Sequence, residues 1–183
     1  MNIEKYKTGI IKLVQQIDSI SIFELIELIK KVKKNKGRIL IVGNGGSIST
    51  ANHIAVDLTK NAKIQTIQTY NDNLITCYAN DYGYKNWISK LVDHHLNKND
   101  IAIFLSVSGN SENLINAAKL CKKKKITIAT LTGQSKKNKL RKYGKINYWV
   151  NSKSYNQVEA VHFIILAIVV DKLVGREVYG TKL

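Results

Sequence analysis

Short apolar runs alternate with helical patterns along most of this chain, and this alternation is the feature that most limits its fold. Each run is short enough for a strand, and its nearly continuous apolar character is typical of strands buried on both faces of a parallel sheet. Repeated strand–helix–strand order leads to doubly wound sheets. We therefore predict an α/β fold with a doubly wound five-stranded parallel sheet. Strands are expected at residues 38–43, 64–70, 101–107, 126–132 and 145–150, and helices at 74–79, 87–96, 112–123 and 155–174.

Two further amphipathic patterns precede the first strand. Apolar residues recur at helical spacing from Ile10 to Ile17 and again from Phe23 to Val32, which indicates helices with one buried face. No linker or internal repeat interrupts the chain. We expect a single domain over residues 1–183, with N-terminal helices in 1–36 and the parallel sheet core and C-terminal helix in 37–183.

The charge of the chain is strongly positive. Lys and Arg number 29 against 13 Asp and Glu, which gives a formal charge of +16. Such a surface attracts anions, including phosphates. Arginine, which reads bases through paired hydrogen bonds, occurs only at Arg38, Arg141 and Arg176, so sequence-specific nucleic-acid recognition is not expected.

The chain carries no pattern of a membrane protein or of a secreted one. Its longest apolar run, near Phe163 to Val170, ends at Asp171 and is well short of the roughly 20 residues that a membrane span needs. The N-terminus lacks the features of a signal peptide. We therefore expect a cytoplasmic protein that does not engage a membrane.

A glycine-rich turn follows the first predicted strand. Glycines let the backbone approach a ligand closely, and the free amides of the next helix favour an anion. The turn does not match G-x-G-x-x-G, because Ile48 takes the place of the last glycine. A tight turn with Ser47 as helix cap is the alternative interpretation. The predicted phosphate-binding residues are Asn44, Gly45, Gly46 and Ser47.

A serine-rich turn follows the third predicted strand. Three hydroxyls and a glycine within six residues suit the peripheral oxygens of a phosphate monoester. The alternative is that the hydroxyls only cap the helix that begins at Glu112. The predicted phosphate-binding residues here are Ser106, Ser108, Asn110 and Ser111.

Taken together, these motifs resemble the sugar isomerase (SIS) domain, and within it the phosphoheptose isomerase family. The resemblance spans nearly the whole chain and lies in GNGGS followed by Ala51-Asn52-His53, in Asn80-Asp81-Tyr82-Gly83-Tyr84, and in SVSGNSENL followed by ITIATLTG. It implies a flavodoxin-like SIS fold and a homotetramer with active sites at subunit contacts. It also implies a sugar phosphate held by Ser47, Ser106, Ser108 and Ser111.

Isomerisation of an aldose and a ketose phosphate needs an acid/base pair. His53 and Asp57 are four residues apart on one predicted helix and therefore share a face. The resembled family has Glu at the second position, where it serves as zinc ligand and base. On the last helix the family has Gln and, eight residues later, His; these positions hold Glu159 and Ala167. Asp57 shortens the carboxylate by one methylene, and Ala167 cannot transfer a proton.

The remaining groups suggest a modified site. Glu159 and His162 are three apart on the last helix, a spacing that helices use for two metal ligands. A zinc site is one hypothesis; its alternative places His162 in the core or at a subunit interface. Asp81 contributes to the site in the resembled family. The predicted catalytic residues are Asp57, Glu159 and Asp81, and the predicted metal ligands are His53, Asp57, Glu159 and His162.

The leading functional hypothesis is an aldose–ketose isomerase. By resemblance it converts sedoheptulose 7-phosphate into a D-glycero-D-manno-heptose 7-phosphate for bacterial surface polysaccharide. A rival from another class is a SIS module that binds a phosphosugar or a protein partner without catalysis, as a sensor or as a platform of the kind that binds a replication initiator. A third possibility is an isomerase of another sugar phosphate.

Overall fold

The structure is a computed structural model that describes residues 2–67, 69 and 71–175. Its centre is a five-stranded sheet in the order β2-β1-β3-β4-β5, and all neighbouring strands are parallel. This confirms the predicted doubly wound sheet, with the flavodoxin-like strand order. The strands are β1 (Ile39–Val42), β2 (Thr66–Ile67), β3 (Ile101–Ser106), β4 (Thr127–Thr132) and β5 (Ile146–Trp149).

The central strands are apolar on both faces because both faces are covered. Ile39 and Ile41 of β1 pack into one hydrophobic cluster, whereas Leu40 and Val42 pack into the other. The edge strand β2 has only two residues in the ladder. It is shorter than the predicted strand at 64–70, of which residues 68 and 70 lie outside the described residues.

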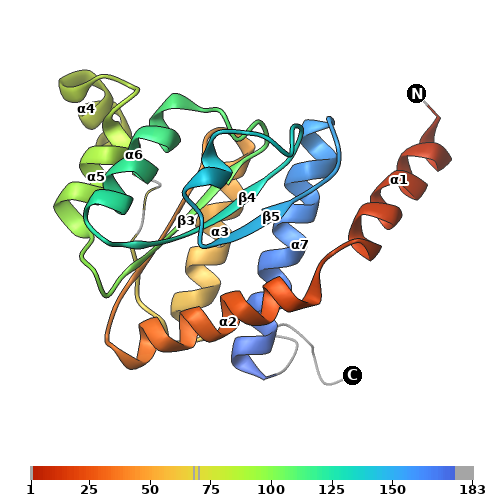
Figure 1. Cartoon of the computed structure of the whole chain (residues 1–183), viewed down its shortest axis with the longest axis horizontal. Helices are drawn as coiled ribbons and strands as arrows, with labels where there is room; N and C mark the ends of the chain where they lie inside the picture. Colours follow the sequence, from red (N-terminus) through yellow and green to blue (C-terminus); the bar gives the residue numbers. More distant parts are fainter. Residues whose placement is uncertain (1, 68, 70, 176–183) are drawn as a thin grey trace.

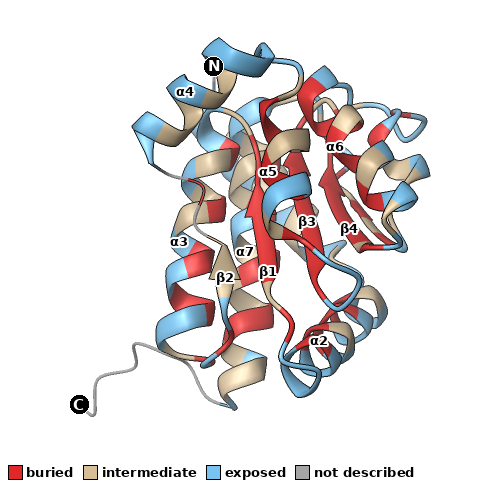
Figure 2. Cartoon of the chain, turned by 90° about the vertical axis from the view of Figure 1, so that its left-hand side faces the viewer, coloured by how far each residue is buried: buried red, intermediate tan, exposed pale blue. Residues whose placement is uncertain are grey.

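Helices cover the two faces of the sheet as two layers (Figures 1 and 2). α2, α3 and α7 belong to the cluster on one face, and α5 and α6 to the cluster on the other, with α4 at its margin. Figure 2 shows β1, β3 and β4 as the buried interior, the edge strand β2 as intermediate, and the outer helix faces as exposed. The helices are α1 (Ile3–Gln15), α2 (Ser19–Lys34), α3 (Gly46–Lys60), α4 (Asp72–Tyr82), α5 (Trp87–His95), α6 (Glu112–Lys123), the short η1 (Leu140–Lys142) and α7 (Tyr155–Val174).

The first helix stands apart from the rest of the fold. In Figure 1, α1 extends away from the sheet and its flanking helices, and none of its residues is buried. Leu13 and Val14 lie partly buried against the core, while Ile3 and Ile11 are 70% and 56% exposed. The apolar face predicted for this helix is therefore only partly covered within one chain.

The parallel topology places the functional turns beside one another. β1 pairs directly with β3, with Val42 opposite Phe104, so the turns that follow these two strands meet at the same edge of the sheet. We call this the carboxyl edge, and the opposite edge, where the strands begin, the amino edge. Within the described residues, no helix has the length and apolar character needed to cross a membrane.

Candidate functional site

The two predicted phosphate turns line one small cavity at the carboxyl edge. Its volume is about 70 Å³, well below the roughly 300–1,000 Å³ of pockets that enclose a whole small molecule. That space suits a phosphoryl group and is too small for a whole sugar. The lining residues are Asn44, Ser47, Leu105, Ser106, Val107, Ser108, Ser111, Tyr155 and Glu159.

The serine-rich turn presents its hydroxyls to this cavity. Ser106 Oγ accepts a hydrogen bond from the Gly109 amide at 3.1 Å, and Ser108 Oγ accepts one from the Asn110 amide at 3.1 Å. Ser108 therefore keeps its own proton to donate to a ligand. Ser106 Oγ also lies 3.4 Å from Ser111 Oγ, and either of these two hydroxyls can donate to the other. Ser111 is the N-cap residue of α6, yet its side chain makes no capping hydrogen bond. Capping alone therefore does not explain the three serines.

The glycine-rich turn also leaves its helix without a side-chain cap. The N-cap residue of α3 is Gly45, whose φ of 54° favours glycine. Ser47 is not the cap; its hydroxyl donates to Glu159 Oε1 at 3.1 Å. A Cβ at Gly46 would lie 2.3 Å from Glu159 Oε2, so glycine lets the carboxylate approach the backbone. The N-terminal ends of α3 and α6 both serve this cavity, and both favour an anion.

An asparagine pair joins the two turns. Asn44 Nδ2 donates to Asn113 Oδ1 at 3.1 Å, and Asn113 Nδ2 donates to Asn44 Oδ1 at 2.9 Å. The Tyr84 hydroxyl also donates to Asn44 Oδ1, at 3.1 Å. Tyr84 belongs to the segment of residues 80–84 that the sequence analysis singled out, whereas Asn113 and the cavity residue Tyr155 were missed. Asn113 could have been found, because it is a polar residue on the buried face of α6 and is 2% exposed.

Three predicted phosphate residues do not line the cavity with their side chains. Gly45 and Gly46 shape the turn through their backbone. Asn110 is exposed; its amide donates to the Ser108 carbonyl at 3.1 Å and accepts from the Lys139 amide at 3.2 Å. Asn110 therefore holds the serine turn in shape.

His53 and Asp57 form a pair on α3. His53 Nε2 lies 3.2 Å from Asp57 Oδ2, and the two side chains are 55% and 11% exposed. Asn61 Nδ2 also donates to Asp57, at 3.2 Å. The His53 ring makes an edge contact with Phe163 of α7, with ring centroids 5.1 Å apart. The structure thus confirms the shared face of His53 and Asp57, and it places both outside the cavity lining.

Glu159 and His162 have different environments despite their spacing. Glu159 lines the cavity, whereas His162 is 1% exposed and its Nε2 lies 3.3 Å from the Thr132 carbonyl oxygen. Burial lowers the pKa of His162 from 6.5 to about 4. Its Nδ1 has no hydrogen-bond partner among the described residues. His162 is therefore a neutral core residue, and the alternative interpretation given for it above is the one that the structure supports.

These positions bear on the zinc ion that the resemblance implies. Among residues 2–67, 69 and 71–175, no three His, Cys, Asp or Glu side chains come together in a way that could hold a metal ion. His53 and Asp57 pair with each other, Glu159 bonds to Ser47, and His162 bonds to the sheet. The four predicted ligands of one chain therefore do not fit a zinc site.

Asp81, the third predicted catalytic residue, lies near the end of α4. It is exposed, and its carboxylate accepts hydrogen bonds from Asn80 Nδ2 at 3.0 Å and from the Cys77 thiol at 3.6 Å. It is not among the residues that line the cavity. Glu159 is therefore the one predicted catalytic carboxylate that faces the cavity.

Known proteins share both this fold and this sequence pattern. The SIS domain family matches residues 5–133. The phosphoheptose isomerase of Cytophaga hutchinsonii is 41% identical over 106 residues, which span 55% of this chain and 56% of that protein's length. The phosphoheptose isomerase of Helicobacter pylori strain P12 is 33% identical over 144 residues, which span 75% of this chain and 74% of that protein.

Solved structures agree with the sequence matches. The structure of phosphoheptose isomerase from Neisseria gonorrhoeae superposes with a TM-score of 0.87 at 25% sequence identity, and covers 93% of this chain and 96% of that one. Sequence and structure thus point to one family. The chain belongs to the phosphoheptose isomerase family of SIS domain proteins.

Proposed function

We propose that this protein is an aldose–ketose isomerase that converts sedoheptulose 7-phosphate into D-glycero-D-manno-heptose 7-phosphate. The observation that carries the proposal is the phosphate-sized cavity in which the two turns meet a carboxylate, Glu159. The family membership of the chain gives the substrate class. We place the reaction in the cytoplasm, as a source of heptose for bacterial surface polysaccharide.

The phosphate group is bound by the serine turn. Ser106, Ser108 and Ser111 offer hydroxyl protons, and the α3 and α6 N-termini offer positive potential. The cavity has no room for the sugar, so the carbon chain extends outward from it. The carbonyl end of a heptose 7-phosphate then lies one sugar length from the serines.

Isomerisation moves one proton between carbons and another between oxygens, through an enediol. Glu159 lines the cavity but bonds to Ser47 of the glycine-rich turn, not to the serine turn that binds the phosphate, and we assign it the carbon-bound proton. His53 lies six residues beyond Ser47, which is about 9 Å along the helix axis. This distance places His53 towards the carbonyl end of the sugar, and we assign it the proton that moves between the oxygens. Asp57 orients the His53 ring, because its Oδ2 lies 3.2 Å from His53 Nε2. None of these steps uses a metal ion.

The protein functions as a homotetramer with sites at subunit contacts. Large apolar side chains remain exposed on the N-terminal helices, and a groove of about 400 Å³ runs between α1, α2 and α7. Such a surface is typical of an interface. Light scattering should give four times the 20.6 kDa chain mass, and Phe23→Glu, which charges this surface, should lower it.

Proton exchange tests the reaction directly. Sedoheptulose 7-phosphate is incubated with the protein in deuterated water, with and without added zinc, and exchange at carbon one is followed by NMR. We expect exchange that Ser108→Ala strongly reduces. Absence of exchange, while the sugar phosphate still raises the melting temperature, would contradict an isomerase and support the module that binds without catalysis.

A further inference from the structure

The amino edge of the sheet carries a row of lysines. Five junctions lead into the five strands, and each holds an exposed lysine within three residues of its strand. We call these five side chains the lysine row. In the spatial order β2-β1-β3-β4-β5 the row is Lys63, Lys36, Lys98, Lys125 and Lys145.

Three members of the lysine row have a backbone conformation that disfavours any side chain. Lys36, Lys63 and Lys125 have φ values of 54°, 56° and 58°. This left-handed conformation costs a non-glycine residue roughly 1–2 kcal/mol, and helices usually end there with glycine or asparagine. Lysine thus recurs at three turns between a helix end and the next strand where the backbone favours another residue. A role for the positive charge explains the recurrence.

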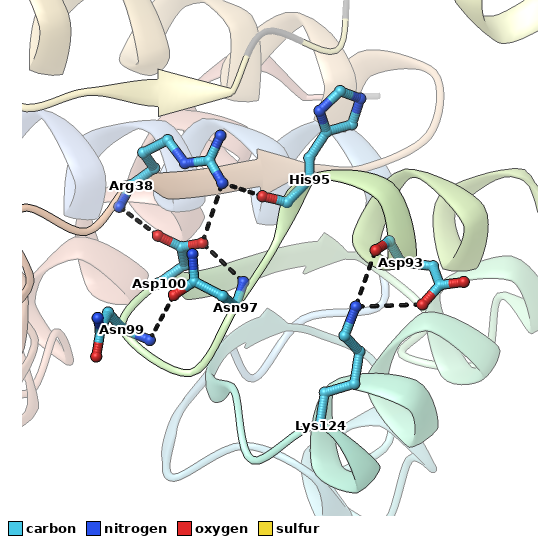
Figure 3. Close-up of polar contacts among 7 residues, drawn as sticks. All are labelled: Arg38, Asp93, His95, Asn97, Asn99, Asp100 and Lys124. Atoms are coloured by element: carbon cyan, nitrogen blue, oxygen red, sulfur yellow. Dashed lines mark hydrogen bonds and ion pairs between the residues drawn. The ribbon is translucent and has the colours of Figure 1, made fainter.

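Acidic side chains do not neutralise the row. The five junctions are residues 35–38, 61–65, 96–100, 124–126 and 143–145, and Asp100 is the one acidic residue in them. Asp100 is buried and accepts hydrogen bonds from the Arg38 and Asn97 amides at 2.7 and 2.8 Å (Figure 3).

The carboxylate of the nearby Asp93 is also paired, with a lysine outside the row. Its carboxylate lies 3.2 Å from Lys124 Nζ, as Figure 3 shows. Among the described residues, no ion pair includes a member of the lysine row. The row therefore presents uncompensated positive charge to the solvent.

The shape of the row favours a linear polyanion. Neighbouring strands are about 4.8 Å apart, so five junctions extend over roughly 20 Å. Lysine binds phosphate as a point charge and does not read bases. The exposed large apolar residues of the described chain all lie outside these junctions, so the edge lacks the side chains that insert into a membrane. We propose that the lysine row binds the phosphate backbone of nucleic acid without reading its sequence.

Fluorescence anisotropy tests this proposal on the full chain. The probe is a labelled oligothymidylate of about 30 nucleotides, a single strand that offers phosphates without base pairing. The test variant is Lys36→Gly/Lys63→Gly/Lys125→Gly, in which glycine suits each backbone conformation, so the melting temperature should not fall. We expect affinity to drop on the order of tenfold, and the slope of log affinity against log salt to shrink by about 2.

A variant of equal net charge serves as the control. Lys136→Gln/Lys137→Gln/Lys153→Gln removes three exposed lysines at the carboxyl edge and should bind the probe like the wild type. An equal loss of probe affinity in both variants would overturn the placement of the site at the lysine row, because net charge alone would then determine binding. No binding by the wild type at near-physiological salt would overturn the proposal. Tighter binding to polyglutamate or to acidic lipid vesicles would overturn the assignment to nucleic acid.

Discussion

The proposed phosphate half of the site and the proposed proton-transfer half differ in how completely one chain assembles them. The phosphate half, formed by the turns after β1 and β3, is joined by the Asn44–Asn113 pair and surrounds one cavity. The proton-transfer half consists of Glu159 on α7 and the His53–Asp57 pair on α3, which contact different partners. The proposed phosphate-binding groups are thus held together within the chain, whereas the proposed proton-transfer groups have separate partners.

Glu159→Gln should produce the largest effect, because it removes the proposed base and little else. Loss of a general base typically costs about 10²–10⁴-fold in rate. Substrate binding should persist or strengthen, since the substitution removes a negative charge beside the phosphate. Steady-state kinetics and calorimetry measure both.

Asp57→Asn is the matched comparison for Glu159→Gln. It also neutralises a carboxylate, but outside the cavity, so we expect a smaller fall in kcat. A larger fall for Asp57→Asn would reverse the assigned roles and move the base to α3.

The pH dependence of stability tests whether His162 is a core residue, although its spacing from Glu159 is one that metal ligands use. Its pKa in the folded state is about 4, below the unfolded value of 6.5. Its contribution to stability is therefore complete above pH 6.5 and is lost as the pH falls towards 4, by about 3 kcal/mol.

Denaturant titrations across this pH range measure that loss. His162→Gln, which does not titrate and still offers an amide to the Thr132 carbonyl, should give a flatter dependence on pH. Parallel curves for the two proteins would show that His162 is not a buried neutral imidazole.

Ser108→Ala should weaken the phosphate half alone. A hydrogen bond to a charged group contributes roughly 1.5–3 kcal/mol, so KM should rise by about 10- to 100-fold. Ser135→Ala is the control, because Ser135 also accepts a backbone amide in an exposed turn but lies outside the cavity. Similar KM changes for both variants would argue against phosphate contact at Ser108.

Asn113→Ala should have the smallest effect in this series. It leaves Asn44 without its paired amide, at a cost of about 1–3 kcal/mol in stability, and it loosens the turns, so KM should rise more than kcat falls. Asn116→Ala, on the same helix, removes a bond to the Lys85 carbonyl and should leave KM unchanged. An unchanged KM for Asn113→Ala would mean that the pair only stabilises the fold.

The sequence predicted the sheet well because the central strands are apolar on both faces, whereas the helices other than α7 have one polar face. β1 and β3 lie within their predicted ranges, and α6 and α7 match theirs. β2 was predicted too long, because apolar residues in an edge segment do not show how many of them pair. The phosphate turns were also predictable, since a parallel sheet brings the ends of adjacent strands together.

The proton-transfer half was harder to predict. α7 is apolar around much of its circumference, so its sequence pattern does not show which side of the helix faces the cavity. Glu159 and His162 were both predicted as metal ligands, although Glu159 bonds to Ser47 and His162 is buried against the sheet. Asp81 was placed in the site by resemblance and by its position just before Tyr82-Gly83-Tyr84. Asn113 stands out as a polar residue on the apolar face of α6, but nothing local shows that its partner is Asn44, which lies 69 residues away in the sequence.

Because all five strands run in the same direction, the cavity and the lysine row are separated by the length of the sheet. The cavity and the lysine row lie at opposite ends of the same five strands. A molecule held on a polymer by the row would keep its cavity open to the solvent. Immobilisation and turnover would then be independent, and the polymer would act as an anchor without competing with the sugar phosphate.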